Sequence, residues 1–147
     1  MKRLKPHFYK QETADSCAPA CLRMVLSHFN LSVSEAELRA RCDCTIFGAD
    51  APYVVDVARQ LGFNKTDIQN ISPDELQILL DEGRHPIVYV NLLPIDGIEG
   101  AHALVALEIG DDSVTVYDPD QGERLLPIGA FFKAWELKLN LAIIVES

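Results

Sequence analysis

The sequence predicts an α+β protein in which helices come first and antiparallel strands follow. Three helical patterns precede residue 62, and each starts near a capping residue or at a proline that suits a first helical turn. From residue 85 onward the pattern changes to short runs rich in Val, Ile, Leu and Tyr, separated by Gly, Asp and Pro turns. This order is typical of N-terminal helices packed on a C-terminal antiparallel β-sheet.

The first helix is predicted over residues 17–29. Pro19 is tolerated in a first turn, and Asp15 or Ser16 just upstream can cap the free backbone donors. Asn30 can end the helix. One apolar stripe at helical spacing faces the core and consists of Leu22, Val25, Leu26 and Phe29.

Four further helices are expected over about 33–41, 51–61, 73–81 and 129–135. Ser32 with Glu35 reads as a capping box for the second helix, with Ala36 and Leu38 facing inward. Residues 72–75 are expected to cap the helix over 73–81. Gly62 is the expected stop of the helix over 51–61.

Strands are predicted over 65–69, 85–92, 102–109, 113–118, 123–128 and 139–145, after a short strand or extended arm over residues 1–10. His102 opens one of these strands and Asp118 ends the next, with the turn 110–112 between them. In an antiparallel hairpin these two strand ends lie side by side, so a carboxylate is expected next to an imidazole.

Cys17 is the candidate nucleophile, because it lies at the positive end of the first helix dipole. The dipole and the unpaired N–H groups of the first turn stabilise a thiolate there. Gln11 lies six residues before Cys17 and can hydrogen-bond a developing oxyanion through its side-chain amide. A thiol, a base, a carboxylate and an oxyanion donor together indicate nucleophilic catalysis.

These residues carry a resemblance to a known family. Gln11, Asp15, Cys17, Ala20, the run LRMVL over 22–26, His102 and the YDP of 117–119 are similar to the bacteriocin-processing, double-glycine-leader cysteine peptidases and their stand-alone relatives. That family has Gln, five residues, Cys, Gly, any residue and Ala, followed later by a His-led strand and an Asp-Pro. The match runs from about Gln11 to Trp135.

The resemblance implies a papain-like cysteine peptidase fold and no cofactor. It implies that Cys17 is the nucleophile, His102 the general base and acid, Asp118 the group that orients the imidazole, and Gln11 the oxyanion donor. It further implies a polypeptide substrate with small residues, often Gly-Gly, before the cut. One position departs from the pattern: Ala18 stands where the family usually has Gly, and a methyl close to the scissile bond would narrow the choice of substrate.

Composition bounds the remaining possibilities. A chain of 147 residues suits a single domain, 1–147, and the net charge of −9 argues against nucleic acid or an anionic membrane as the main partner. No apolar run reaches the ~18 residues of a membrane-spanning helix, so no membrane insertion is expected. The N-terminus lacks the apolar stretch of a secretory signal, which predicts a cytoplasmic protein with free thiols. The oligomeric state cannot be predicted.

The cysteines other than Cys17 and the histidines other than His102 are expected to have structural roles. Cys21 is expected in the core, and Cys42 and Cys44 as loop thiols, partly exposed. These cysteines have poor zinc spacing, since only one residue separates the last two, so no metal is predicted. His7 and His85 are read as structural, and His28 as a partner of the last carbonyls of its own helix.

Two other functions stay open at this point: a peptide- or protein-binding module on the same fold, and a small-molecule amidase or acyltransferase. The loop over 94–100, with Asp96 and Glu99, is predicted to line the cleft and to favour a basic segment of substrate.

Overall fold

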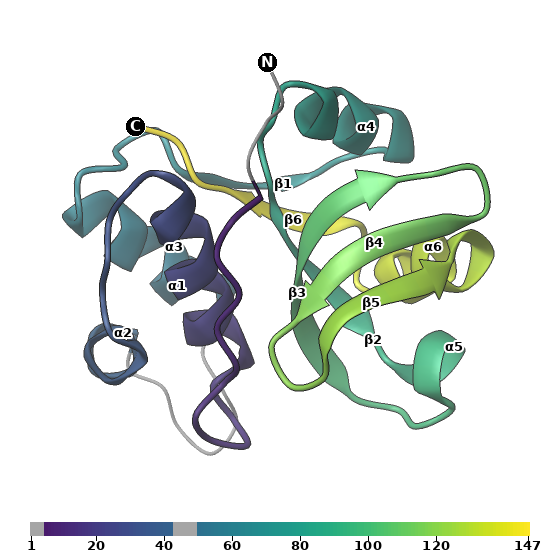
Figure 1. Ribbon diagram of the computed structural model, residues 1–147, viewed down its shortest axis with the longest axis horizontal. Coiled ribbons are helices and arrows are strands. Elements are labelled where there is room, and N and C mark those ends of the chain that lie inside the picture. Colours follow the sequence, from purple (N-terminus) through teal and green to yellow (C-terminus); the bar gives the residue numbers. More distant parts are fainter. Residues whose placement is uncertain (1–4, 43–49) are drawn as a thin grey trace.

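The computed structural model describes residues 5–42 and 50–147 (Figure 1). Cys44 and the rest of the segment 43–49 lie outside the described residues. The helices are α1 (Cys17–His28), α2 (Glu35–Arg41), α3 (Ala51–Gln60), α4 (Pro73–Asp81), α5 (Leu93–Asp96) and α6 (Ile128–Glu136). The strands are β1 (Asp67–Asn70), β2 (Ile87–Asn91), β3 (Ala101–Ile109), β4 (Ser113–Asp118), β5 (Gly122–Pro127) and β6 (Leu141–Ile144).

Within the described residues, the six strands form one sheet in the order β1-β6-β2-β3-β4-β5. Every neighbouring pair is antiparallel. Strands β3, β4 and β5 are consecutive hairpins, whereas β1 reaches the sheet only by pairing with β6 near the C-terminus. The predicted α+β class is therefore confirmed, with strand ends shifted by one or two residues.

Two apolar cores lie on the two faces of the sheet. One contains the buried side chains of α1, α2 and α3 together with Ile87, Val105 and Ile143 of the sheet. The other contains those of α4 and α6 together with alternate residues of β2, β3 and β4. Figure 1 shows α1–α3 on one side of the sheet and α6 on the other. Alternation of side chains along each strand supplies both cores from the same sheet.

Helix α1 has an almost fully buried apolar face, and Leu22, Met24 and Leu26 are each 0% exposed. It ends as predicted, because Asn30 adopts a left-handed φ of 63°. Phe29 is 41% exposed, so the predicted stripe stops short of the last residue. The predicted cap by Ser16 is wrong: its Oγ accepts from Thr13 N at 3.0 Å and makes no capping bond to the helix.

The capping box predicted at Ser32 and Glu35 is wrong, and the true N-cap of α2 is Ser34, whose Oγ accepts from Glu37 N at 3.2 Å. Leu38 is buried as predicted, but the predicted inward position of Ala36 is wrong: Ala36 is exposed and Glu35 is buried. The capping box at Ser72 is confirmed, with both reciprocal bonds present.

The loop expected over 94–100 begins with the short helix α5, since Asn91 Oδ1 accepts from Leu93 N at 3.0 Å and Gly97 ends the turn at φ 77°.

Residues 5–10 form an extended arm that runs between the helices and the sheet (Figure 1). Phe8 packs edge-on against Tyr117 of β4, with ring centroids 5.4 Å apart. The arm then bonds to the end of the β4 hairpin, where Gln11 N donates to Pro119 O at 2.7 Å. The arm therefore brings Gln11 to the end of the strand that carries Asp118.

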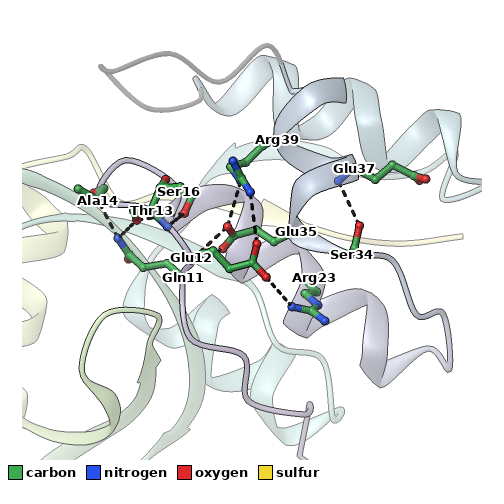
Figure 2. A network of polar contacts seen from close by, with 10 residues as sticks. All are labelled: Gln11, Glu12, Thr13, Ala14, Ser16, Arg23, Ser34, Glu35, Glu37 and Arg39. Atoms are coloured by element: carbon green, nitrogen blue, oxygen red, sulfur yellow. Dashed lines mark hydrogen bonds and ion pairs between the residues drawn. The ribbon is translucent and has the colours of Figure 1, made fainter.

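A buried carboxylate holds the residue after Gln11 (Figure 2). Glu35 is 0% exposed and accepts two bonds from Glu12 N, at 2.9 and 3.1 Å, and one from Arg39 Nε at 3.1 Å. The Glu12 carboxylate pairs with Arg39 at 3.2 Å and with Arg23 at 3.7 Å. A charge can be buried at this depth only because backbone and guanidinium donors replace its water.

Glu35→Ala should lower the free energy of unfolding by about 3 kcal/mol, because it removes the buried acceptor of Glu12 N and Arg39 Nε and leaves Arg39 with Glu12 alone. Glu37→Ala is the matched control: it removes an equivalent (i, i+4) arginine pair on the same helix, at 3.3 Å, but one that is 52% exposed. The control should change stability by about 0.5 kcal/mol or less. Urea unfolding followed by circular dichroism measures both, and equal losses would contradict the structural role of Glu35.

Candidate active site

Cys17 is the first residue of α1 and is partly exposed. The first intrahelical hydrogen bond runs from Ala20 N to Ser16 O at 3.0 Å, so Cys17 N and Ala18 N precede the regular ladder. Pro19 has no N–H to satisfy. The positive end of the helix dipole is thus at the sulfur atom, as the sequence predicts.

His102 and Asp118 are brought together by the register of β3 and β4. Val105 pairs with Tyr117, so the next step of the register puts Asp118 opposite Leu104, two residues from His102 on the same face. Diagonal neighbours of this kind are within reach of long side chains. His102 Nε2 lies 2.7 Å from Asp118 Oδ1, and the two side chains are 11% and 2% exposed.

The imidazole of His102 is bonded on both sides. Burial lowers its pKa, but hydrogen bonds to Asp118 and to Cys17, together with the charges of these groups, outweigh burial and raise the pKa of His102 to about 10. Because Nε2 is bonded to Asp118, Nδ1 is the ring nitrogen left to interact with Cys17. Burial would also raise the pKa of the Asp118 carboxyl, yet the bond and charge of His102 hold it below its usual range. This arrangement favours imidazolium beside carboxylate.

Asp118 has further donors that the sequence reasoning missed. Its Oδ1 accepts from Asp120 N at 2.9 Å and Gln121 N at 3.3 Å, and its Oδ2 accepts from Arg124 Nη1 at 3.1 Å. The signal for Arg124 was present in the tight β4–β5 hairpin, where Asp118 pairs with Gly122 and Val116 pairs with Arg124. A residue six positions after Asp118 is therefore its diagonal neighbour.

Asp96, predicted to attract a basic substrate, is instead bonded within the protein. It pairs with Arg124 at 2.7 and 3.2 Å. Its negative charge is thus neutralised by the arginine that also holds Asp118.

Gln11 lies at the end of the arm, and its amide does not point to open solvent (Figure 2). Nε2 donates to Thr13 O at 2.8 Å and to Ala14 O at 3.2 Å, which ties the turn that leads into α1. Among the described residues, Gln11 Oε1 is buried and has no hydrogen-bond partner. In this conformation both amide hydrogens serve the turn, which the sequence alone did not indicate.

The other thiols with described positions are inaccessible. Cys21 is 0% exposed, as predicted, and burial raises its pKa well above the usual value. Cys42 is also 0% exposed, which corrects the expectation of a partly exposed loop thiol. Ala18 is 1% exposed, so its methyl group packs into the core and is not presented to a substrate.

The remaining histidines have structural contacts. His28 Nε2 lies 3.1 Å from Gly83 O, on a neighbouring loop and not on its own helix as predicted. His85 Nδ1 lies 3.0 Å from Ala106 O, and the two imidazoles meet edge to face. In residues 5–42 and 50–147, no group of three or more His, Cys, Asp or Glu side chains is arranged to hold a metal ion.

Comparison with known families decides the class of enzyme. The model of the Peptidase C39 family matches residues 5–147. The chain belongs to this family. It is a cysteine peptidase related to the bacteriocin-processing enzymes, as the sequence pattern predicts.

Individual relatives agree with the family. The chain is 26% identical over 125 residues to the probable microcin-H47 secretion/processing ATP-binding protein MchF of Escherichia coli; the match covers 85% of the chain but only 16% of that protein. The peptidase domain of Streptococcus ComA, a bi-functional ABC transporter of a quorum-sensing pathway, superposes with a TM-score of 0.78 at 25% identity, over 96% of the chain and 100% of the domain.

The fold is shared with a double-glycine-motif protease from an AMS/PCAT transporter, solved with a leader peptide. The TM-score is 0.78 at 20% identity, and the match covers 99% of the chain and 94% of the protease. For the part of the C39 chain that the structure describes, no helix is long and apolar enough to cross a membrane.

The raised pKa of His102 predicts how stability depends on pH. An imidazole with a pKa of 6.5 when unfolded and about 10 when folded stabilises the protein fully below pH 6.5 and loses this contribution as pH rises to about 10. Asp118 stays ionised throughout this window. Urea unfolding of wild type and His102→Gln should be measured from pH 6 to 10. The difference between their free energies of unfolding should shrink as pH rises, at most by the one-proton slope of about 1.4 kcal/mol per pH unit. Parallel curves would contradict the raised pKa.

Proposed function

We propose that this C39 peptidase cleaves peptides through a triad of Cys17, His102 and Asp118. The observation that carries the proposal is the short bond, 2.7 Å, between the imidazole and a buried carboxylate, on an imidazole whose pKa is also raised by the Cys17 thiol. Such a chain of groups is the usual means of activating a thiol nucleophile.

In the first half of the reaction the Cys17 thiolate attacks the scissile carbonyl carbon, and the carbonyl π pair moves to oxygen. The backbone N–H of Cys17 stabilises this oxyanion at the positive end of α1. As the intermediate collapses, the C–N bond breaks and the imidazolium of His102 gives its proton to the leaving amine. A thioester on Cys17 results.

In the second half, neutral His102 takes a proton from water, and the resulting hydroxide attacks the thioester. The C–S bond then breaks, which releases the carboxylic acid product and restores the thiolate beside the imidazolium. Asp118 holds the ring in one orientation and stabilises its positive charge in both halves. The raised pKa of His102 supports this resting state.

Gln11 is proposed as the side-chain donor to the oxyanion. To act in this way, its amide must turn from Thr13 O and Ala14 O toward the substrate oxygen. The cost is limited, because Oε1 is buried without a partner in the present orientation and such an orphan acceptor costs roughly 1–3 kcal/mol. The backbone of Gln11 stays fixed during this turn, since Gln11 N and Glu12 N are both bonded.

The proposed substrate is a polypeptide cut after small residues such as Gly-Gly. Support comes from the relatives named above, one of which is a double-glycine-motif protease solved with a leader peptide. The buried methyl group of Ala18 leaves room for such a substrate, and the net charge of −9 favours a neutral or basic peptide over nucleic acid. We further propose one peptidase domain over residues 1–147 and a cytoplasmic location.

Cleavage of a peptide with Gly-Gly in its middle tests this function, with the same peptide carrying Val-Val as control. Wild type should cut after Gly-Gly only, and Cys17→Ala and His102→Ala should be slower by roughly 10³-fold or more. Mass spectrometry identifies the products, and a peptide aldehyde ending in Gly should add one adduct to wild type and none to Cys17→Ala. Binding of the peptide without cleavage would point to a binding module, and turnover of small amides alone to an amidase.

The role of Gln11 is tested by steady-state kinetics. If its amide serves the oxyanion, Gln11→Ala should lower kcat by roughly 10²–10³-fold with little change in KM. If it only ties the turn over 13–14, the variant should unfold at lower urea concentration and keep most of its kcat. Thr13→Val, which keeps the carbonyl that Gln11 bonds, is the control for general disturbance of the turn.

A further inference from the structure

The guanidinium of Arg124 lies between two carboxylates. Nη1 is 3.1 Å from Asp118 Oδ2 and 3.2 Å from Asp96 Oδ2, and Nη2 is 2.7 Å from Asp96 Oδ1. Arg124 therefore holds Asp96 with two bonds and Asp118 with one. The pair with Asp118 is shielded, since the Asp118 side chain is 2% exposed, whereas Arg124 and Asp96 are 24% and 36% exposed.

Arg124 binds the carboxylate oxygen that the imidazole does not use. Oδ1 of Asp118 accepts from His102 Nε2 and from two backbone N–H groups of the following turn. Among the hydrogen bonds of the described residues, Oδ2 accepts only from Arg124. Holding both oxygens fixes the plane of the carboxylate, and with it the line along which Oδ1 meets the imidazole.

Asp96 connects this bond to the chain segment that precedes His102. It is the last residue of α5, in the connection between β2 and β3. That connection is closed by Asn91 Oδ1, which accepts from Leu93 N at 3.0 Å and Gly100 N at 3.4 Å. The Asp96–Arg124–Asp118 contacts therefore join the segment before His102 to the strand after Asp118.

The charges alternate along this line of groups: Asp96 negative, Arg124 positive, Asp118 negative and His102 positive, followed by Cys17. Two groups that flank a third compete for their interaction with it. Arg124 weakens the attraction between Asp118 and the imidazolium, and Asp96 weakens the attraction between Arg124 and Asp118. A change at Arg124 should thus act on His102 in the opposite sense to a change at Asp96.

We propose that Arg124 is a positioning residue of the proposed triad, and that Asp96 sets how strongly Arg124 draws on Asp118. The inference deepens the proposed function and rests on it. Neither residue touches substrate or reacting atoms. Their effect reaches Cys17 only through the orientation and charge of His102.

The test compares Arg124→Met, Arg124→Lys and Asp96→Asn with wild type in peptide cleavage from pH 5 to 11. Arg124→Met should lower kcat about 10- to 100-fold through a misplaced carboxylate, with KM nearly unchanged, and Arg124→Lys should recover part of the loss. Glu123→Gln is the matched control on the same strand: it breaks only the exposed pair with Lys5 and should match wild type.

The high-pH limit of kcat/KM reports loss of the imidazolium proton. In Arg124→Met, Asp118 acts on the imidazolium unopposed, so this limit should move to higher pH. In Asp96→Asn, Arg124 binds Asp118 more fully, so the limit should move to lower pH. NMR titration of the His102 ring protons should show the same opposite shifts, which a merely structural role would not produce.

Asp118→Ala separates failure of this inference from failure of the triad. If Asp118→Ala abolishes cleavage but the Arg124 and Asp96 variants keep wild-type kcat and pH limits, the positioning role is wrong and the triad stands. If Asp118→Ala cleaves like wild type, the proposed triad fails and the positioning role with it. Should Arg124→Met not fold, Arg124→Lys and the surface variant Asp96→Asn still give the two shifts, and shifts in the same direction would overturn the proposal.

Discussion

The bond between His102 and Asp118 is the interaction on which the site depends, and it is a product of the β3–β4 register. A slip of one residue would turn one of the two side chains to the opposite face of the sheet. The register is protected by the cores on both faces, because the same slip of β4 would move Tyr117 out of one core and Val116 out of the other. Packing energy far larger than the bond itself therefore holds the two groups together.

Two buried carboxylates share one method of stabilisation. Glu35 and Asp118 are 0% and 2% exposed, and each accepts backbone N–H groups and an arginine that reaches solvent. Glu35 holds the arm beside Gln11, and Asp118 orients the imidazole. Neither charge could be buried without these donors, since desolvation of an isolated carboxylate exceeds the stability of a whole domain. The chain thus uses buried charge where a loop must be held in one place.

The arm over residues 5–10, together with the turn over 11–14 that follows it, joins the helices to the sheet. It packs Phe8 on Tyr117, bonds Gln11 N to Pro119 O and bonds Glu12 N to Glu35. Its partners come from β4, from the turn after β4 and from α2, while its end leads directly into α1. A segment without regular secondary structure therefore aligns the helix carrying the thiol with the hairpin carrying the base.

The α+β class, most helix and strand positions, the peptidase family and the pairing of His102 with Asp118 could all be predicted from the amino-acid sequence. The class, the elements and the pairing depend on local periodicity, turn residues and hairpin geometry, which act over short distances along the chain, whereas the family follows from the resemblance of the motif residues. Three features became evident only in the folded protein: Glu35 faces inward, Gln11 donates to its own turn, and Arg124 joins Asp96 to Asp118. Each of these depends on which polar groups meet after burial, and donors and acceptors from distant segments leave no periodic signal in the sequence.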